Sequence, residues 1–143
     1  MLKFILIISK QGQTRLAQYY DERREPTQKT SLEAELIRKV LLRGNKGCSF
    51  LDYQDFKVVY RRYLSLYFLI GIDKEENEVA ILEFIHLIVE TLDKYFPKVT
   101  DLDIMFNLDK VYMILDEMVV NGCIVETSKA KILEPVRLIE QHR

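Results

Sequence analysis

The chain has 143 residues, of which 48% are hydrophobic and 30% are charged, and its formal net charge is −1. That composition is typical of one globular domain with a sizeable core, spanning residues 1–143. The longest apolar runs, such as residues 4–8, are far shorter than the roughly 18 residues of a membrane span, and no concentrated stripe of Lys and Arg indicates a nucleic-acid-binding surface.

The N-terminus lacks the basic, then apolar, then small residues of a signal peptide, so we expect a cytosolic protein. In that compartment the two cysteines, Cys48 and Cys123, are expected to be reduced and buried. Charge is distributed unevenly, because residues 1–62 carry a net +6 and residues 63–143 a net −7. One interpretation is that the two halves attract each other, or that their charges lie in solvent on opposite faces. The other is that a basic surface meets an acidic partner.

The first half of the chain predicts a hairpin, one helix and three further strands. The predicted strands are residues 1–10, 14–21, 48–53, 56–63 and 66–73. The charged segment around Pro26 is expected to be a surface connection. Thr30 or Ser31 is then expected to cap a helix that runs to about Arg43. The glycines and asparagine of residues 44–47 predict the end of that helix.

Residues 77–96 form the longest periodic segment and predict a central helix. Asp73 or Asn77 is expected to cap its start, and Pro97 is expected to end it. Its apolar positions form two faces, so two layers of structure can pack against it. These positions are Val79, Leu82, Ile85, Val89, Leu92 and Phe96 on one face, and Ile81, Phe84, Ile88 and Tyr95 on the other.

The last part of the chain predicts two more helical regions. Residues 100–120 carry apolar residues at helical spacing, with an interruption near Asn107. A final helix is expected from Thr127 or Ser128, and Pro135 should kink or end it. The element order is therefore ββ-α-βββ-α-α-α. Because the three middle strands are joined by very short segments, they predict an antiparallel meander, and the whole predicts an α+β fold with helices on an antiparallel sheet.

The sequence gives no positive case for an enzyme. Glu83 and His86 have the Glu-x-x-His spacing of half a di-iron site, but no second such pair exists, and the only other histidine is His142. Gly44 and Gly47 lack the spacing of a phosphate-binding loop. We therefore expect no catalytic residue, no metal and no cofactor.

Several segments resemble the small, or sigma, subunit of the heterotetrameric clathrin-adaptor complexes. They are QGQTRLAQYY after the first strand, CSF followed by FKVVYRRY, NEVAILEFIHLIVETLDKYF, LDIMFNLDKVYMILDEMVVNG and ETSKAKIL. The resemblance covers nearly the whole chain. The residues NGCIV before ETSK are most similar to the sigma subunit of the fourth adaptor-protein complex. Pro135 departs from the unbroken last helix of the commoner sigma subunits.

This resemblance implies a longin-like fold, in which five antiparallel strands are flanked by helices. It also implies a core subunit in vesicle-mediated protein transport. Such a subunit packs on a large adaptin, joins a second large chain and a mu subunit in a heterotetramer, and helps to recognise acidic dileucine signals on cargo tails. Its expected location is peripheral, on trans-Golgi or endosomal membranes and coated vesicles, with membrane contact made through the complex.

The signal-binding positions that the resemblance implies are Arg15, Leu64, Leu66, Val89, Lys98 and Val99. Arg15 stands in the family's GxTRL motif and would face the acidic residue of the signal. The other positions would line an apolar pocket for the two leucines. Leu64 replaces a residue that is usually small there, and Lys98 replaces a usual asparagine or serine. Without the resemblance, Arg15 is more simply a solvated charge, and Leu66, Val89 and Val99 are ordinary core residues.

Two other interpretations remain open. A purely structural subunit would stabilise its large partner without binding a signal, which is expected if Leu64 fills the pocket. A longin-type tethering or fusion protein would need a heptad segment or a lipid anchor after the domain. Affinity capture together with a large adaptin and a mu chain would separate the adaptor interpretations from the tethering one.

Overall fold

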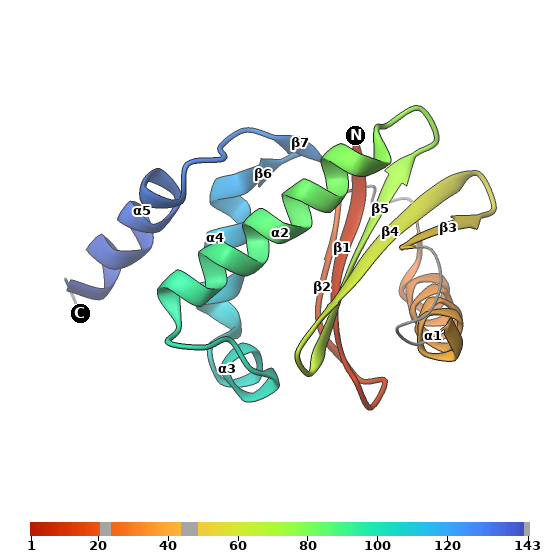
Figure 1. Ribbon diagram of the computed structural model, residues 1–143, viewed down its shortest axis with the longest axis horizontal. Coiled ribbons are helices and arrows are strands. Elements are labelled where there is room, and N and C mark those ends of the chain that lie inside the picture. Colours follow the sequence, from red (N-terminus) through yellow and green to blue (C-terminus); the bar gives the residue numbers. More distant parts are fainter. Residues whose placement is uncertain (21–23, 44–48, 142–143) are drawn as a thin grey trace.

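The computed structural model describes residues 1–20, 24–43 and 49–141. The strands of its main sheet are β1 (Leu2–Ser9), β2 (Thr14–Tyr19), β3 (Phe50–Tyr53), β4 (Phe56–Tyr63) and β5 (Leu66–Asp73). The helices are α1 (Pro26–Arg43), α2 (Glu78–Tyr95), α3 (Asp101–Phe106), α4 (Leu108–Met118) and α5 (Lys129–Gln141). The five strands are antiparallel to their neighbours and lie in the order β2-β1-β5-β4-β3, with helices on both faces (Figure 1).

β1 is an interior strand of the sheet, between β2 and β5, although it comes first along the chain. It pairs with β2 across a short turn and with β5, where Leu2 lies opposite Ile72 and Ser9 opposite Leu66. β3, β4 and β5 form the predicted antiparallel meander. The backbone N–H of Leu2 also donates to the carbonyl of Gly122 over 2.8 Å, which joins the start of the chain to its C-terminal third.

Successive strand residues point to opposite faces, so each face of the sheet builds its own apolar cluster. On one face Phe4, Leu6 and Ile8 of β1 pack with α1. On the other face Ile5 and Ile7 pack in a larger cluster with α2, α4 and α5. Figure 1 shows the resulting three layers, with α1 on one side of the sheet and α2, α4 and α5 on the other.

α2 is the central helix that the sequence predicts. The Asn77 side chain accepts hydrogen bonds from the backbone N–H groups of Val79 and Ala80 over 3.0 and 3.2 Å, so Asn77 is the cap and Asp73 is not. Val79, however, is 63% exposed, and its predicted burial is wrong. Ile81 is buried under the same helix. Because successive helical residues are rotated by about 100°, the side chain of Val79, two residues earlier, points about 200° away from that of Ile81.

α1 begins earlier than the sequence analysis predicts, at Pro26 rather than after a cap at Thr30 or Ser31. Proline suits the first helical position, because the first N–H groups of a helix have no partner and the ring already holds a helical φ. The hydroxyl of Thr30 donates to the carbonyl of Pro26 over 3.0 Å, so it is a residue inside the helix. The predicted end at Arg43 is confirmed.

Pro135 does not end the last helix, because α5 continues to Gln141. A proline inside a helix removes one backbone hydrogen bond and crowds the preceding turn. Ile132 and Leu133 before it and Val136 after it are fully buried in the core. Packing on both sides of the proline therefore holds the helix together across it.

The sequence analysis missed a short hairpin, β6 (Val119–Val120) and β7 (Cys123–Ile124), before α5. Its turn is Asn121-Gly122. Both turn residues have positive φ, 52° and 80°, as a tight two-residue hairpin turn requires. The predicted interruption of the preceding helical region is confirmed, since α3 and α4 meet at Asn107.

Cys123 is exposed on β7, so its predicted burial is wrong. Its neighbours Ile124 and Val125 are 38% and 56% exposed, so this short hairpin strand lies at the surface rather than in the core. Cys48 and the segment 44–47 lie outside the described residues, and so does the predicted start of the third strand. Across the described ranges, no helix is long and apolar enough to cross a membrane.

Lys110 of α4 is a buried lysine. It is 5% exposed, and its Nζ is buried without a hydrogen-bond partner among the described residues. A buried ammonium that lacks a partner opposes folding, whereas a methionine of similar length does not. Lys110→Met should raise the free energy of unfolding by about 1 to 2 kcal/mol in chemical denaturation. The exposed Lys98 is the matched control, and Lys98→Met should change stability little.

Candidate functional site

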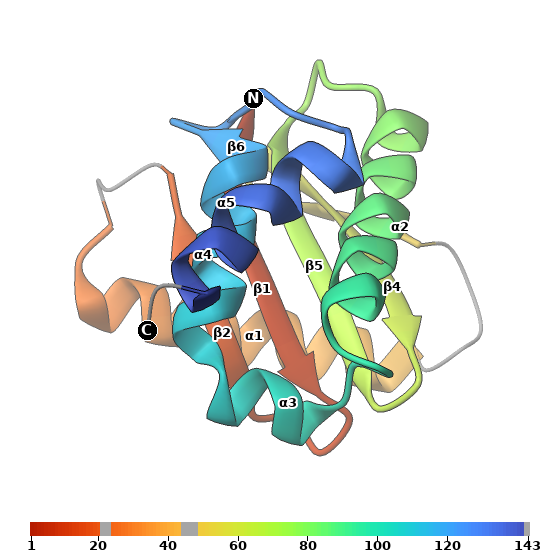
Figure 2. The same ribbon diagram turned by 90° about the vertical axis from the view of Figure 1, so that its left-hand side faces the viewer.

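The six residues predicted to bind a cargo signal gather at one end of the molecule. They are Arg15 on β2, Leu64 in the β4–β5 turn, Leu66 at the start of β5, Val89 on α2, and Lys98 and Val99 between α2 and α3. The β1–β2 turn, the β4–β5 turn, the C-terminal end of α2 and the whole of α3 lie at this end in two perpendicular views (Figures 1 and 2). A backbone hydrogen bond of 2.9 Å from Lys10 to Ser65 joins the two turns.

Three of the six residues meet in one apolar cluster between the sheet and α2. Leu66 and Val99 are 0% exposed and Val89 is 6% exposed. This is also what the interpretation as ordinary core residues predicts. In this structure the three side chains are part of the closed core, so two leucines of a ligand need this part of the core to open.

Asp93 of α2 holds the connection between α2 and α3 in place. Its carboxylate accepts a hydrogen bond from the hydroxyl of Tyr63 over 2.5 Å and one from the backbone N–H of Val99 over 3.0 Å. The bond to Asp93 raises the pKa of Tyr63, which keeps this phenol a donor. Thr100 and Asp103 then form a capping box that starts α3. The sequence analysis did not single out Asp93, because its partners lie on other elements.

Leu64 and Lys98 do not belong to the apolar cluster. Leu64 has a φ of 52°, and its side chain is 49% exposed. A left-handed backbone is uncommon for leucine, because its Cβ crowds the following carbonyl. In this turn the side chain lies in solvent to a large extent. Lys98 is exposed as well.

Arg15 is held by an acidic residue of α3. Its Nε donates to Oδ1 of Asp101 over 2.5 Å, and one terminal nitrogen donates to Oδ2 over 3.1 Å, which makes a two-pronged ion pair. The second terminal nitrogen lies 3.5 Å from the sulfur of Met105. Both charged side chains are only about one-fifth exposed. Arg15 is therefore not the solvated charge of the simpler interpretation.

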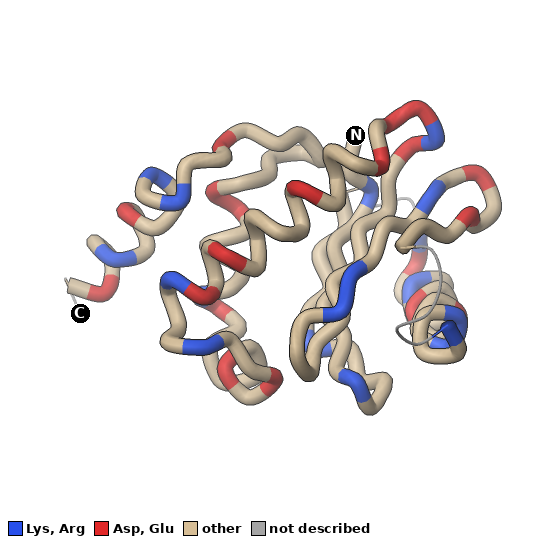
Figure 3. Tube along the Cα trace, viewed as in Figure 1, with Lys and Arg blue, Asp and Glu red and all other residues tan. Residues whose placement is uncertain are grey.

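Asp101 and Met105 are neighbours of the site that the sequence analysis missed. Asp101 follows Arg15 by 86 residues, and an acidic residue at the start of a helix is expected from the helix dipole alone. α3 contains two aspartates and no lysine or arginine, as its trace in Figure 3 shows. Its apolar residues Leu102, Met105 and Phe106 are exposed. Their spacing puts them on one helical face.

The Glu-x-x-His pair is a feature of the helix surface. His86 Nε2 lies 3.1 Å from one carboxylate oxygen of Glu90, and the other oxygen accepts a hydrogen bond of 2.7 Å from Lys129 of α5. This contact with Lys129 lowers the pKa of Glu90. Glu83 is exposed, and within the described ranges no group of three His, Cys, Asp or Glu is placed to hold a metal ion. His142 lies outside the described residues.

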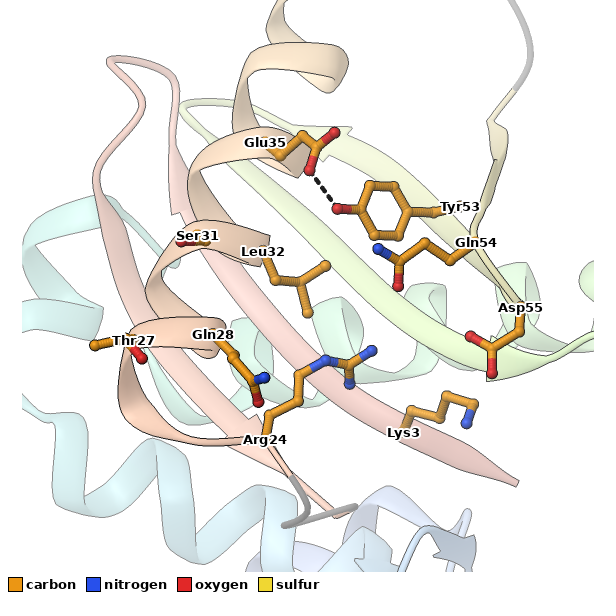
Figure 4. A pocket seen from close by; sticks show the side chains of 10 residues that line it. All are labelled: Lys3, Arg24, Thr27, Gln28, Ser31, Leu32, Glu35, Tyr53, Gln54 and Asp55. Carbon is orange, nitrogen blue, oxygen red and sulfur yellow. Dashed lines mark hydrogen bonds between the residues drawn. The ribbon is translucent and has the colours of Figure 1, made fainter.

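A separate polar hollow of about 730 Å³ lies between the first half of α1 and the β3–β4 turn (Figure 4). Beside it the hydroxyl of Tyr53 donates to Glu35, and the guanidinium of Arg24 lies 5.3 Å from the centre of the Phe56 ring. None of the six predicted residues lines it. The hollow is therefore not part of the predicted signal site.

Comparison with known proteins decides the family. All 143 residues match the family model described as the clathrin adaptor complex small chain. The chain belongs to the clathrin adaptor small-chain family. AP-4 complex subunit sigma of Arabidopsis thaliana is 56% identical to this small chain, over 98% of this chain and 97% of the relative. AP-4 complex subunit sigma-1 of Homo sapiens is 55% identical, over 99% and 97%.

A more distant relative and a structure extend the comparison. AP-1 complex subunit sigma-1A of Homo sapiens is 46% identical to this small chain, over 95% of this chain and 85% of the relative. A chain in a homology model of the full-length AP-3 complex in a stretched open conformation superposes with a TM-score of 0.71. The two chains are 31% identical, and the superposition covers 99% of this chain and 95% of the AP-3 chain.

These matches confirm the resemblance to sigma subunits and the particular similarity to the fourth complex. The small chain is a sigma subunit of an adaptor complex, which fits vesicle transport, and its family is not enzymatic. The predicted α+β fold of longin type, with a five-stranded antiparallel sheet, is confirmed. Sigma subunits assemble with adaptin chains in a complex. They are associated with coats and lie peripherally on membranes.

Proposed function

We propose that this sigma subunit packs on a large adaptin in a heterotetramer with a second large chain and a mu subunit, and that it helps to read acidic dileucine signals. The observation that supports signal binding is the guanidinium of Arg15, held by a fork of hydrogen bonds at the same end of the molecule as Leu66 and Val99. An acidic dileucine signal needs a charge-assisted hydrogen bond and an apolar surface close together. The trans-Golgi network and endosomes are the membranes proposed.

A second candidate function has its own support. Leu66, Val89 and Val99 are buried in the core, and Arg15 already has an acidic partner. Both features are expected if the small chain only stabilises its large partner. In that case the side chains of the predicted site serve folding and binding to the adaptin, and no signal enters.

The prediction that separates the two functions uses Arg15→Ala in the assembled complex. Removing the guanidinium should weaken binding of a labelled acidic dileucine peptide about tenfold, since a charge-assisted hydrogen bond is lost. The loss should shrink as salt concentration rises, because a partly exposed ion pair is screened. A fluorescence titration measures both effects. Arg61→Ala removes an exposed arginine of β4 and is the matched control.

The outcomes differ clearly. Equal affinity of the wild-type and Arg15→Ala complexes would remove Arg15 from signal binding. No binding of the peptide by a complex that assembles normally would favour the purely structural subunit. Leu64→Ala tests the remaining part of the site, because an unchanged affinity shows that this exposed side chain does not obstruct the two leucines.

A further inference from the structure

Asp101 already binds the guanidinium of Arg15, which the proposed function assigns to the acidic residue of a signal. The ion pair uses the edge of Arg15 formed by Nε and one terminal nitrogen, which presents two parallel N–H groups to a carboxylate. What remains is the end of the guanidinium, where one terminal nitrogen faces the sulfur of Met105 at 3.5 Å. Sulfur is a weak acceptor. A second carboxylate therefore has either to displace Asp101 or to bind at this end, beside Met105.

The ion pair also removes most of the attraction that Arg15 alone would exert. A carboxylate that approaches the pair meets the positive charge of Arg15 and the negative charge of Asp101 at similar distances. Because both side chains are only about one-fifth exposed, water screens this repulsion less than at an open surface. Asp103, two residues further along α3, adds another negative charge on the same helix.

The local structure keeps Asp101 in this place. The Thr100 side chain accepts a hydrogen bond of 3.2 Å from the backbone N–H of Asp103, and the Asp103 side chain accepts one of 3.0 Å from the backbone N–H of Thr100. This box fixes the first turn of α3, where Asp101 is the first residue. Ile104, fully buried, anchors the same short helix in the core. The backbone at Asp101 is thus held in place, so displacing Asp101 from Arg15 requires its side chain to change conformation.

We propose that Asp101 is an internal ligand of Arg15 that sets how strongly, and how selectively, the site binds an acidic signal. This inference rests on the proposed function of Arg15. In the wild-type protein the acidic residue of the signal competes with Asp101, so it contributes less to binding than it would at a guanidinium without an internal partner. Removing the charge of Asp101 leaves the positive charge of Arg15 unbalanced and makes the site more selective for acidic signals.

The test is a titration of assembled complexes with a labelled acidic dileucine peptide and with the same peptide carrying glutamine in place of its acidic residue. Asp101→Asn keeps the size of the side chain and one carbonyl acceptor for Arg15 but removes the charge. It should bind the acidic peptide about tenfold more tightly than wild type, with the gain falling as salt rises. The glutamine peptide should show no gain, and neither should the double variant Arg15→Ala, Asp101→Asn.

Glu83→Gln is the charge-matched control, because it removes one exposed negative charge on α2, outside the site. It should leave both affinities unchanged. If wild type binds through Arg15 and Asp101→Asn binds equally or more weakly, the inference fails while the proposed function stands. If wild type does not bind but Asp101→Asn binds in an Arg15-dependent way, the inference holds. If none of the complexes binds either peptide, the inference and the proposed function fail together.

Discussion

Gly71→Ala should destabilise the protein by about 3 kcal/mol, the upper end of what overpacking a core costs. A Cβ atom built on Gly71 would lie 2.2 Å from the ring of Phe4, on the neighbouring strand β1. The ring cannot give way easily, since it is 0% exposed and its centre lies 5.8 Å from that of Phe56 and 5.7 Å from that of Tyr19. The requirement for glycine is steric, because Gly71 does not have a positive φ.

A double-mutant cycle with Phe4→Leu checks this explanation. The shorter side chain should open the space above Gly71, so the double variant should be more stable than the sum of the two single changes predicts, by at least about 1 kcal/mol. Chemical denaturation of the four proteins measures this coupling. If Gly71→Ala is tolerated, or if the two changes are simply additive, contact with the Phe4 ring is not the reason for glycine.

Val89→Asp should be as severe, and it acts on the fold and the site together. Val89 is 6% exposed among the core residues under α2, and an unpaired carboxylate there costs several kcal/mol. We expect loss of soluble small chain and of its co-purification with a large adaptin. Val79→Asp is the control on the same helix, because Val79 is exposed in the first turn, where a negative charge is favourable.

The contrast between the two variants is the test. Similar stability and assembly of Val79→Asp and wild type, with failure of Val89→Asp, agrees with the structure. Normal assembly of Val89→Asp would instead show that this face of α2 opens to solvent. Such opening is what entry of a ligand between Leu66, Val89 and Val99 requires.

The sheet and the central helix could be predicted because their signals are local. β-rich runs joined by very short turns leave an antiparallel meander as the only simple arrangement, and Asn77 and Pro97 mark the ends of α2 within a few residues. The errors came where packing outweighs local preference. Pro135 is tolerated because Ile132, Leu133 and Val136 are buried around it. Pro26 was assigned to a loop, although it suits the start of a helix.

The candidate site was only partly predictable for a different reason. Arg15, Val89 and Val99 were named through the family resemblance, and the structure places them at one end of the molecule. Their relation to Asp93 and Asp101 depends on contacts between elements far apart in the chain. Neither aspartate has a spacing that points to its partner. The outward position of Leu64 likewise depends on the left-handed backbone of one turn, which a leucine in the sequence does not indicate.

The place of β1 inside the sheet, between β2 and β5, has a consequence for protein synthesis. β1 leaves the ribosome first, yet its partner β5 ends at residue 73 of 143. Until then the β1–β2 hairpin presents an unpaired edge, and the apolar residues on both of its faces lack the layers that later cover them. Such a nascent chain is prone to aggregation, so translation that pauses before β5 should increase its binding to chaperones. Moving the β1–β2 hairpin to the C-terminus by circular permutation would let it add to β3, β4 and β5, which are then already paired.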